Sequence, residues 1–404
     1  MDCKSVGKTI SKLRKKHGYT QTELAEKLDI TDKAVSRWES GQGYPDISLF
    51  PALAELFGVS IDYLMLGEKK GIVIAGSLIL DIVNSINVYP ESGMMSYILG
   101  NASYAVGGCA ANTSIDLAKI DPSLPIQVFG RVGLDENGRY IISQLQRAGI
   151  NTSKIRFSDE LPTSFCNVMS IQSGERTFFH QKGANMEFSP DDVDVSSLNC
   201  DIFHIGYIFL LDKFDQPDDQ YGTVMARFLH QLQKAGIKTS IDVVSDSTAD
   251  YAALLIPTFK YCDYVIINEV ECCTVWGLNP RRDDGSIDKD AVLEAMKKTV
   301  DAGVGRKVII HSKECSFIMN TKKEYVEIRS LNIPPQDIKG SVGAGDAFCA
   351  GCLYGIYNDY SDRQILEFAS SAAACSLFAA NSVDGMKSKQ EILRIAEKYR
   401  DSNF

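Results

Sequence analysis

The stretch Lys339-Gly-Ser-Val-Gly-Ala-Gly-Asp-Ala-Phe-Cys-Ala-Gly351 contains the sharpest chemical feature of this 404-residue chain. Gly343, Ala344 and Gly345 permit a tight backbone turn immediately before an apolar helix pattern. Backbone N–H groups converge at such a helix start, and the helix dipole favours negative charge there. Asp346 stands at this start, where an ionised carboxylate can accept a hydroxyl proton beside a bound phosphate. The stretch therefore predicts a phosphate-binding turn; the simpler alternative is an ordinary connection from a loop to a helix.

Around this turn, from Gly71 to the end of the chain, short apolar runs alternate with longer amphipathic ones. Strands are predicted near 72–75, 126–129, 202–205, 238–243, 264–267 and 307–311, and helices near 109–119, 137–149, 220–235, 288–302, 345–358, 363–380 and 388–401. This alternation is typical of a mainly parallel sheet with helices on both faces. Ligands of such sheets bind at the carboxyl ends of the strands. Residues 82–106 do not fit a crossover helix and are predicted to form a small β flap.

The composition excludes several classes of protein. With 45% hydrophobic and 23% charged residues, the chain has the composition of a folded protein of two or three domains at roughly 100–200 residues each. No apolar run approaches the ~20 residues that cross a bilayer, and the first residues lack a signal-peptide pattern, so we expect a cytoplasmic protein without a membrane partner. The eleven cysteines are expected to be reduced, and Cys349 and Cys352 to be small core residues. None of the five histidines is expected to join a group of metal ligands.

Charge is distributed unevenly along the chain. The total formal charge of −10, taken alone, argues against nucleic-acid binding. However, residues 1–70 contain 11 lysines and arginines against 10 aspartates and glutamates, so the net charge of residues 71–404 is −11. Six basic residues precede the first glutamate: Lys4, Lys8, Lys12, Arg14, Lys15 and Lys16. This locally basic end fits a partner that carries phosphates.

The first seventy residues carry the signals of several short helices. Apolar residues at helical spacing predict a first helix that Gly18 ends. Thr20 and Glu23 form a capping box that opens a second helix, and Thr31 can cap a third. The third helix is predicted to bury one side and to leave four polar residues facing outward: Asp32, Lys33, Ser36 and Arg37.

This segment resembles the phage-repressor (Cro and repressor type) helix-turn-helix family in three runs, at residues 20–28, 34–41 and 53–60. The resemblance implies binding of double-stranded DNA, with the third helix in the major groove. Gln21 would then bind a phosphate or brace the recognition helix, while base edges would be faced by Asp32, Lys33, Ser36 and Arg37. Because one such module binds weakly, a homodimer is expected. The alternative is a small helical bundle that binds protein.

The second part of the chain contains five further motifs in a recognisable order. They are Gly76-Ser77-x-x-x-Asp81, Gly107-Gly108-Cys-Ala-Ala-Asn112, Gly130-Arg-Val-Gly-x-Asp-x-x-Gly138, Gly174-Glu-Arg-Thr-Phe178 with Gly183-Ala-Asn185, and Asn268-Glu-Val-Glu271. Together with the turn before Asp346, they closely resemble the ribokinase, or phosphofructokinase-B type, carbohydrate kinase family across 71–390. The resemblance implies a ribokinase-like three-layer α/β sandwich with a small β lid, about 82–106, which transfers phosphate from ATP to a sugar hydroxyl.

The same resemblance implies roles for individual residues. Asp346 would be the general base, and the amides of Gly343, Ala344 and Gly345 would form an anion hole. Sugar hydroxyls would be bound by Asp81, Gly107, Gly108 and Asn112. Asn268 and Glu271 match the magnesium and triphosphate motif, with Glu271 acting through water because Mg²⁺ dehydrates reluctantly. The nucleotide would be flanked by residues 311–316, among them His311, Lys313 and Ser316, together with Gly345.

Several motif residues have simpler structural interpretations, and others depart from the family pattern. Asp81 could cap a strand end, Gly107 and Gly108 could form a simple turn, and Asn268 with Glu271 could open a helix. Gly340 stands where relatives have an acidic residue that helps to hold a monovalent cation, which argues against potassium activation. The nucleotide segment, usually Thr-x-Gly-x-x-Gly, reads His-Ser-Lys-Glu-Cys-Ser over 311–316 and lacks both glycines. Cys109 replaces the lysine or glycine common in the sugar motif.

Taken together, the motifs predict a helix-turn-helix domain over 1–67 and a carbohydrate kinase domain over 71–404. The kinase domain is expected to use ATP and Mg²⁺, and the whole protein is expected to link sugar metabolism to transcription. One alternative is a sugar-sensing regulator with little catalysis. Another is a nucleoside kinase, in which Phe178 and Phe179 stack on a base. The acceptor and the DNA sequence are not defined by these motifs.

Overall fold

The computed structural model describes residues 3–66, 70–171, 176–246 and 248–399. The chain divides into two compact units, Met1–Lys70 and Gly71–Phe404. The predicted junction at 67–71 falls largely on residues 67–69, which lie outside the described residues, and so does Gly174 of the fourth kinase motif.

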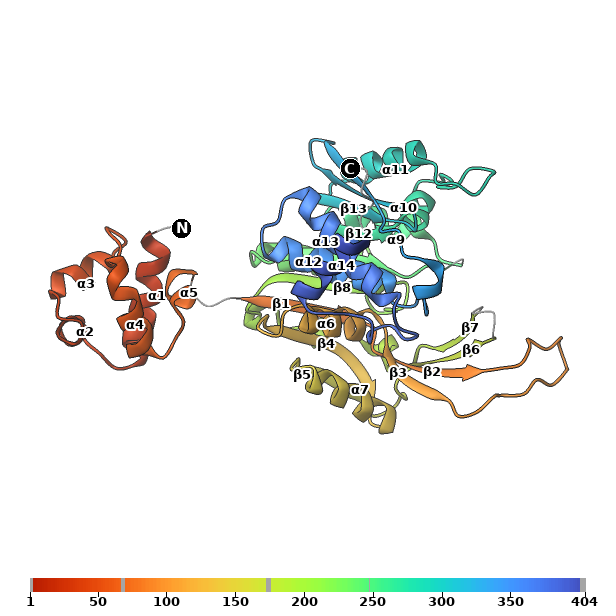
Figure 1. The fold of residues 1–404 in the computed structure, drawn as a ribbon, viewed down its shortest axis with the longest axis horizontal. Helices are drawn as coiled ribbons and strands as arrows, with labels where there is room; N and C mark the ends of the chain where they lie inside the picture. Colours follow the sequence, from red (N-terminus) through yellow and green to blue (C-terminus); the bar gives the residue numbers. More distant parts are fainter. Residues whose placement is uncertain (1–2, 67–69, 172–175, 247, 400–404) are drawn as a thin grey trace. The chain divides into compact units, whose positions relative to one another are not determined.

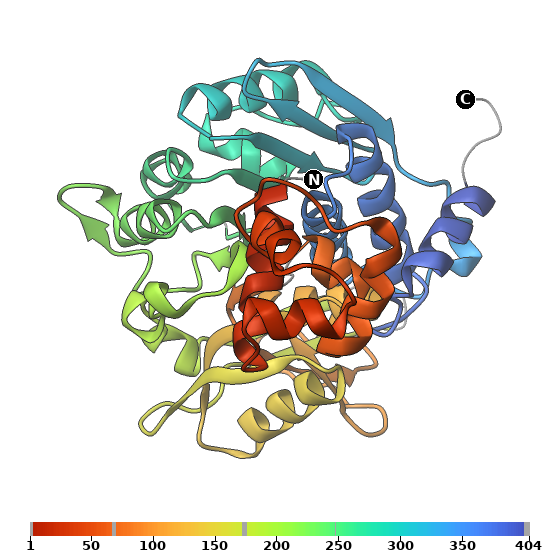
Figure 2. The ribbon, with the colours of Figure 1, turned by 90° about the vertical axis from the view of Figure 1, so that its left-hand side faces the viewer.

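The first unit is a bundle of five α-helices (Figures 1 and 2): α1 (Cys3–Lys16), α2 (Gln21–Lys27), α3 (Asp32–Glu39), α4 (Phe50–Phe57) and α5 (Ile61–Leu66). The predicted capping box is present, since the Thr20 hydroxyl accepts from the Glu23 amide and Glu23 accepts from the Thr20 amide. Thr31 caps α3, as predicted. Apolar residues from all five helices form one core, which fixes α3 against α1 and α2.

The second unit is built on a nine-stranded sheet in the order β15-β14-β13-β12-β11-β8-β1-β4-β5. The seven strands from β13 to β5 pair in parallel, while β14 and β15 extend the β13 edge in antiparallel fashion. The strands are β1 (Gly71–Gly76), β4 (Ile126–Gly133), β5 (Asn151–Ser158), β8 (Cys200–Ile208), β11 (Lys238–Val243), β12 (Tyr264–Asn268), β13 (Lys307–His311), β14 (Cys315–Asn320) and β15 (Tyr325–Arg329). The strand order reverses between β1 and β8, which is where ligands bind to such sheets.

Helices cover both faces of this sheet and complete the predicted three layers (Figure 1). Along β1, Ile72 and Ile74 face one helical layer, and Val73 and Ala75 face the other. The first layer contains α6 (Cys109–Ile120), α7 (Glu136–Arg147), α12 (Ala344–Tyr357), α13 (Asp362–Ser376) and α14 (Lys389–Tyr399). The second contains α8 (Val224–Lys234), α9 (Tyr251–Phe259), α10 (Glu269–Val275) and α11 (Lys289–Asp301). In the described part of the chain, no helix combines the length and apolar character needed to span a bilayer.

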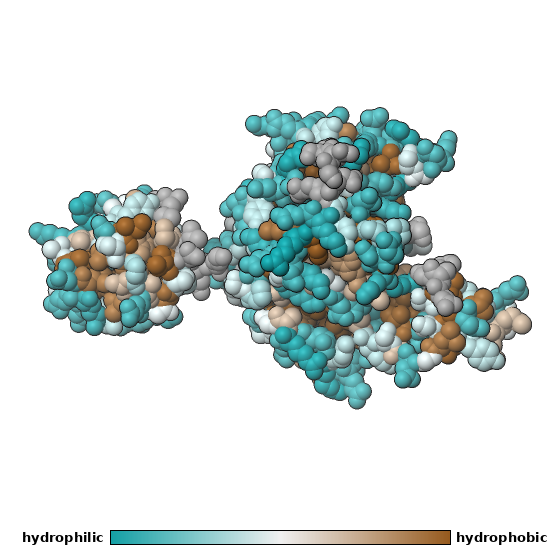
Figure 3. Space-filling model, viewed as in Figure 1, coloured by the Kyte–Doolittle hydropathy of each residue, from teal (hydrophilic) through white to brown (hydrophobic). Residues whose placement is uncertain are grey.

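A separate four-stranded sheet forms the lid (Figure 1), in the order β3-β2-β6-β7. Its strands are β2 (Ile79–Ser85), β3 (Ser103–Gly107), β6 (Phe165–Ser170) and β7 (Arg176–Gln181). The predicted flap over 82–106 therefore covers only half of the lid, because β6 and β7 join it from a later part of the chain. Apolar residues gather on the visible face of the lid (Figure 3), and exposed ones include Met94, Met95 and Tyr97 between β2 and β3.

Candidate functional site

Four neighbouring parallel strands end in polar side chains that converge on one cavity. Tyr207 comes from the end of β8, Asp242 from β11, Asn268 from β12 and His311 from β13. The N-terminal turn of α12, residues 343–346, forms the opposite wall of this cavity, whose volume is about 280 Å³. The site thus lies at the carboxyl edge of the sheet, as the strand pattern predicts.

The turn before α12 has the conformation that its glycines allow. Gly343 has a φ of 81°, which disfavours any residue with a side chain, and a Cβ there would lie 2.5 Å from the carbonyl oxygen of Ser382. The amides of the first turn of a helix have no partner within the helix, and Gly343, Ala344 and Gly345 line the cavity. The Ala344 amide, one of the three predicted anion-hole donors, instead donates to the carbonyl of Ser341 at 3.3 Å.

Asp346 is buried in the first turn of α12, with 5% of its surface exposed. Its Oδ2 accepts hydrogen bonds from the Asn112 side-chain amide at 2.8 Å and from the Tyr207 hydroxyl at 3.0 Å. Burial raises the pKa of Asp346 to about 7, and the carboxylate of Asp242 adds to this rise, whereas the two hydrogen bonds oppose it. A carboxyl group with this pKa can take up and release a proton near neutral pH.

Asp81, Gly107, Gly108 and Asn112, the predicted sugar-binding set, lie together between the lid and α6. Gly108 has a φ of 81° and a Cβ there would be 2.4 Å from the carbonyl oxygen of Ser77, so this position needs glycine, whereas a Cβ on Gly107 would be 2.5 Å from Oδ2 of Asp81 and would displace that side chain. Burial raises the pKa of Asp81 to about 6, although the positive charge of Arg176 lowers it in part. Asn112 is more heavily engaged than expected, since it also accepts from the Ser382 hydroxyl at 3.0 Å.

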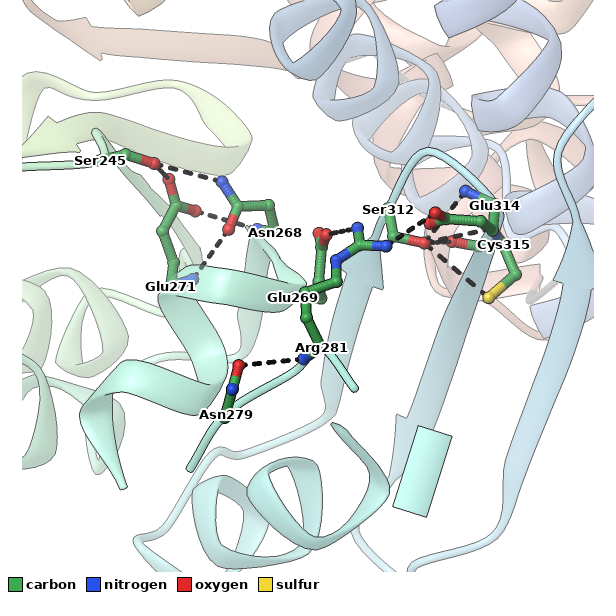
Figure 4. Close-up of polar contacts among 9 residues, drawn as sticks. All are labelled: Ser245, Asn268, Glu269, Glu271, Asn279, Arg281, Ser312, Glu314 and Cys315. Atoms are coloured by element: carbon green, nitrogen blue, oxygen red, sulfur yellow. Dashed lines mark hydrogen bonds and ion pairs between the residues drawn. The ribbon is translucent and has the colours of Figure 1, made fainter. Parts of the chain in front are cut away.

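The Asn268 and Glu271 pair opens a helix, which is one of the two roles considered from the sequence (Figure 4). The two residues form a capping box that opens α10, with amide-to-side-chain distances of 2.8 and 2.9 Å. Both also line the cavity of about 280 Å³ beside Asp242. Glu271 accepts a further bond from the Ser245 hydroxyl at 2.8 Å, and burial raises its pKa to about 7. Its two carboxylate oxygens are therefore both bonded to the protein.

A second cavity of about 420 Å³ adjoins the first and shares with it the walls made by His311, Ser341, Ala344 and Gly345. Its other walls are partly apolar and include Leu331, Ile333, Phe348, Ala373 and Leu377. The predicted nucleotide residues His311, Lys313 and Ser316 all line it. The ring centroids of His311 and Phe348 are 4.9 Å apart, and burial lowers the pKa of His311 to about 4, so the ring is neutral at pH 7.

The turn between β13 and β14 is held without the glycines of the family pattern (Figure 4). The Ser312 hydroxyl accepts from the Cys315 amide at 3.1 Å and donates to the Cys315 carbonyl at 2.8 Å. Arg281 bridges Glu314 of this turn, at 2.7 Å, and Glu269 at the start of α10. The bridge joins the turn that lines the second cavity to the helix that carries Glu271.

In the helical unit, α3 exposes the four residues predicted to face DNA, namely Asp32, Lys33, Ser36 and Arg37, while Val35 and Trp38 are buried. Gln21 braces this helix, because its side-chain amide donates to Glu39 at the end of α3 at 2.8 Å. Glu39 also forms a buried ion pair with Arg14 of α1, at 2.6 Å. Of the two roles considered for Gln21, the structure thus contains the brace.

Several residues of the site were not identified from the sequence. Tyr207, Ser245 and Ser382 belong to no motif and reach the site only through the folding of distant segments. His204 in β8 was expected to stand apart from any ligand group, which is wrong: potential ligand atoms of Cys109, His204 and Asp242 lie within 4.8 Å of one another. Asp242 at the end of β11 could have been identified as a site residue, because a charged residue at the end of an apolar strand is unusual in a buried sheet.

Comparison with known proteins agrees with this geometry. The model of the pfkB family carbohydrate kinases matches residues 72–389, and a helix-turn-helix family model matches residues 10–64. Ribokinase of Arabidopsis thaliana is 24% identical over 327 residues, which cover 80% of each chain. A 5-dehydro-2-deoxygluconokinase of Geobacillus kaustophilus is 22% identical over 315 residues, or 74% of this chain and 86% of the relative.

Solved structures share the fold of the second unit. The structure of Arabidopsis thaliana ribokinase complexed with ribose and ATP superimposes with a TM-score of 0.67 at 22% identity, covering 81% of this chain and 99% of the other. At this identity the likeness concerns the fold, while the family model covers well over half of the chain. The chain therefore belongs to the pfkB family of carbohydrate kinases and carries a helix-turn-helix domain ahead of the kinase domain.

Proposed function

We propose that this kinase transfers the γ-phosphoryl group of ATP to a sugar hydroxyl with Asp346 as the general base, and that its N-terminal domain binds double-stranded DNA. The observation that carries the catalytic proposal is the position of Asp346. It is buried, it lines the first cavity, and it stands in the first turn of α12 behind a glycine of positive φ. This arrangement brings a proton acceptor and a site for anions to the same point.

In the proposed reaction, Asp346 takes the proton of the acceptor hydroxyl while the hydroxyl oxygen attacks the γ-phosphorus. The bond from that phosphorus to the bridging oxygen breaks, and ADP leaves. The amides of Gly343 and Gly345 stabilise the developing charge; Ala344 can join them once its amide turns away from Ser341. Asp81 and the close backbone of Gly107 and Gly108 hold the sugar hydroxyls.

Magnesium fits the donor set of the first cavity. Asn268 and Glu271 offer the oxygen ligands that Mg²⁺ prefers, opposite the proposed phosphate site. Both oxygens of Glu271 are already bonded, so we propose that this residue holds the ion through water. When bound, Mg²⁺ neutralises charge on the phosphates of ATP. The second cavity, with an apolar side and the neutral ring of His311, suits the base and ribose of the nucleotide.

The test is ADP formation against a panel of pentoses, hexoses, sugar acids and nucleosides. Asp346→Asn should lower the turnover of the preferred acceptor by about 10²–10⁴-fold, because it removes the base. Asp116→Asn is the matched control, since Asp116 is also a buried aspartate of the first helical layer but does not line either cavity. Unchanged turnover in Asp346→Asn would refute the assignment, and a preference for nucleosides would favour the nucleoside kinase alternative.

For the N-terminal domain we propose sequence-specific binding to the major groove by α3, as a homodimer on paired half-sites. The exposed polar face of α3 and the brace from Gln21 to Glu39 support this assignment. Selection from randomised duplex DNA with the full chain tests it, and binding that is insensitive to salt would count against it. Because ATP and DNA are its proposed ligands, we propose that the protein works in the cytoplasm.

A sensor with little catalysis is the second candidate, and the altered turn over 311–316 favours it. If the protein is such a sensor, the preferred sugar should change its affinity for the selected DNA by about 5–150-fold, the usual range of coupling between two sites. Identical DNA binding with and without the preferred sugar would exclude it.

A further inference from the structure

A group of four buried side chains lies behind the proposed base, and the kinase mechanism does not use it as a group. Cys109 opens α6, His204 lies in β8, Asp242 ends β11 and Cys349 is one turn beyond the start of α12. The exposed fractions of these residues are 0%, 0%, 6% and 2%. Around Nε2 of His204, Oδ2 of Asp242 lies at 3.3 Å, Sγ of Cys349 at 3.6 Å and Sγ of Cys109 at 3.9 Å.

The outer contacts of this group orient its donor atoms inward. Nδ1 of His204 is 3.0 Å from the Ser240 hydroxyl, which holds the ring and turns Nε2 toward the sulfur atoms. Oδ1 of Asp242 accepts from the Tyr207 amide at 2.6 Å, which leaves Oδ2 for the group. A Cβ at position 206 would lie 2.0 Å from the Cys109 sulfur and 2.4 Å from Asp242, so the group has room only because this residue is Gly206. Support of this kind is typical of metal ligands.

Hydrogen bonding alone satisfies this arrangement poorly. A neutral Nε2 can make one hydrogen bond, either as donor to Asp242 or as acceptor from one thiol, whereas three groups surround it. The three distances from Nε2 are close to three edges of a tetrahedron around zinc: with Zn–S near 2.3 Å and Zn–N or Zn–O near 2.0–2.1 Å, tetrahedral angles separate N from S by about 3.5 Å and N from O by about 3.3 Å. Thiolate and imidazole donors favour zinc over magnesium.

We propose that Cys109, His204, Asp242 and Cys349 bind a zinc ion. The ligand atoms of the first three already lie within 4.8 Å of one another, and Cys349 supplies the fourth position by rotation of its side chain. Four protein ligands leave no open position, so the ion is structural. It ties the starts of α6 and α12 to the sheet, and with them Gly108, which directly precedes Cys109, and Asp346, which lies about one helical turn before Cys349. The proposal stands independently of the acceptor and of the DNA function.

Metal binding by the purified full chain tests the site. After removal of metal with a chelator, Co²⁺ should give the intense visible bands of a tetrahedral site with thiolate ligands, and Zn²⁺ should displace it at one ion per chain. Absence of these bands in the wild-type protein would overturn the proposal.

Variants then identify the ligands. Cys109→Ser and Cys349→Ser should each weaken zinc binding by at least tenfold, while Cys352→Ser should bind as the wild type does, because this buried thiol of the same helix is outside the group. Unchanged zinc affinity in either of the first two variants would overturn the four-ligand site. Circular dichroism of each metal-free variant checks that the fold is retained.

Discussion

The side-chain amide of Asn112 donates a 2.8 Å hydrogen bond to Oδ2 of Asp346, from a helix more than two hundred residues earlier in the chain. Because this bond stabilises the ionised form, it holds the pKa of Asp346 below the value that burial alone would set. The proposed base must be ionised to act, so activity should fall as the pH drops through about 7. In Asn112→Ala the acid limb of kcat/KM should move upward by about 1–2 pH units, given roughly 1.5–3 kcal/mol for a hydrogen bond to a charged group.

Thr113→Val provides the control for this pH profile. Thr113 is the next residue of α6, and its buried hydroxyl finds no hydrogen-bond partner among the described residues. Its removal should leave the acid limb where it is. An acid limb that does not move in Asn112→Ala would mean that the observed ionisation belongs to another group, such as Glu271, whose pKa is also raised to about 7.

Gly343→Ala should destabilise the kinase unit and lower its activity. Alanine disfavours a φ of 81° by roughly 1–2 kcal/mol, and its methyl group would meet the Ser382 backbone at 2.5 Å. We expect a loss of at least about 1 kcal/mol in the free energy of unfolding, measured with urea. Gly345→Ala is the matched stability control, since the nearest atom to its methyl group would be 3.5 Å away, in ordinary contact. Equal midpoints for the two variants would contradict the strain argument.

Asp116→Asn should stabilise the protein increasingly as the pH rises. Neither carboxylate oxygen of Asp116 has a hydrogen-bond partner in the described part of the chain, and burial raises its pKa well above the ordinary value. The folded state then keeps a proton that the unfolded state releases, so wild-type stability falls as the pH rises above the usual aspartate range. The advantage of the variant should grow by up to about 1.4 kcal/mol per pH unit, measured by urea unfolding between about pH 5 and 8. A constant difference would indicate that Asp116 is ionised in the fold.

Arg37→Ala and Gln21→Ala should affect DNA binding in different ways. Arg37 is exposed on α3, and its loss should relax base preference at one position of the selected site by about 1–3 kcal/mol. Gln21 holds α3 through Glu39, so its loss should weaken binding to all sequences alike. Competition between duplexes with single base changes measures both effects. An unchanged preference in Arg37→Ala would remove Arg37 from the base-reading face.

Local sequence signals predicted the central elements of the fold well. The first parallel strands and the capped helices at Thr20 and Thr31 follow from apolar spacing and capping residues, which act over a few neighbours. The edge strand β5 was missed, because its sequence Asn-Thr-Ser-Lys-Ile-Arg-Phe-Ser is mostly polar and half exposed. The lid strands β6 and β7 were missed as parts of the same sheet as 82–106, because β6 pairs with β2 across some eighty residues and β7 joins the sheet only through β6.

The residues of the candidate site also fall into those that carry a local sequence signal and those that do not. Asp346, Gly343 and Glu271 carry their signals in neighbouring residues, since turn glycines and capping boxes are local. Tyr207 and Ser382 contribute single polar atoms from unrelated segments, and only the folded chain brings them to Asp346 and Asn112. His204 looked like an isolated polar residue in an apolar strand, because its neighbours Cys109 and Cys349 lie far away in sequence.

The bridge that Arg281 makes between Glu269 and Glu314 has a consequence for the cost of binding a nucleotide (Figure 4). In many sites a glycine-rich loop is mobile until its ligand arrives, and ordering the loop then subtracts from affinity. Here the turn has no glycine and is already tied to α10, so its conformational entropy is lost during folding instead of during binding. The proposed nucleotide cavity is thus preorganised by Arg281, and substitution of Arg281 should lower the affinity for ATP more than it lowers the rate of the chemical step.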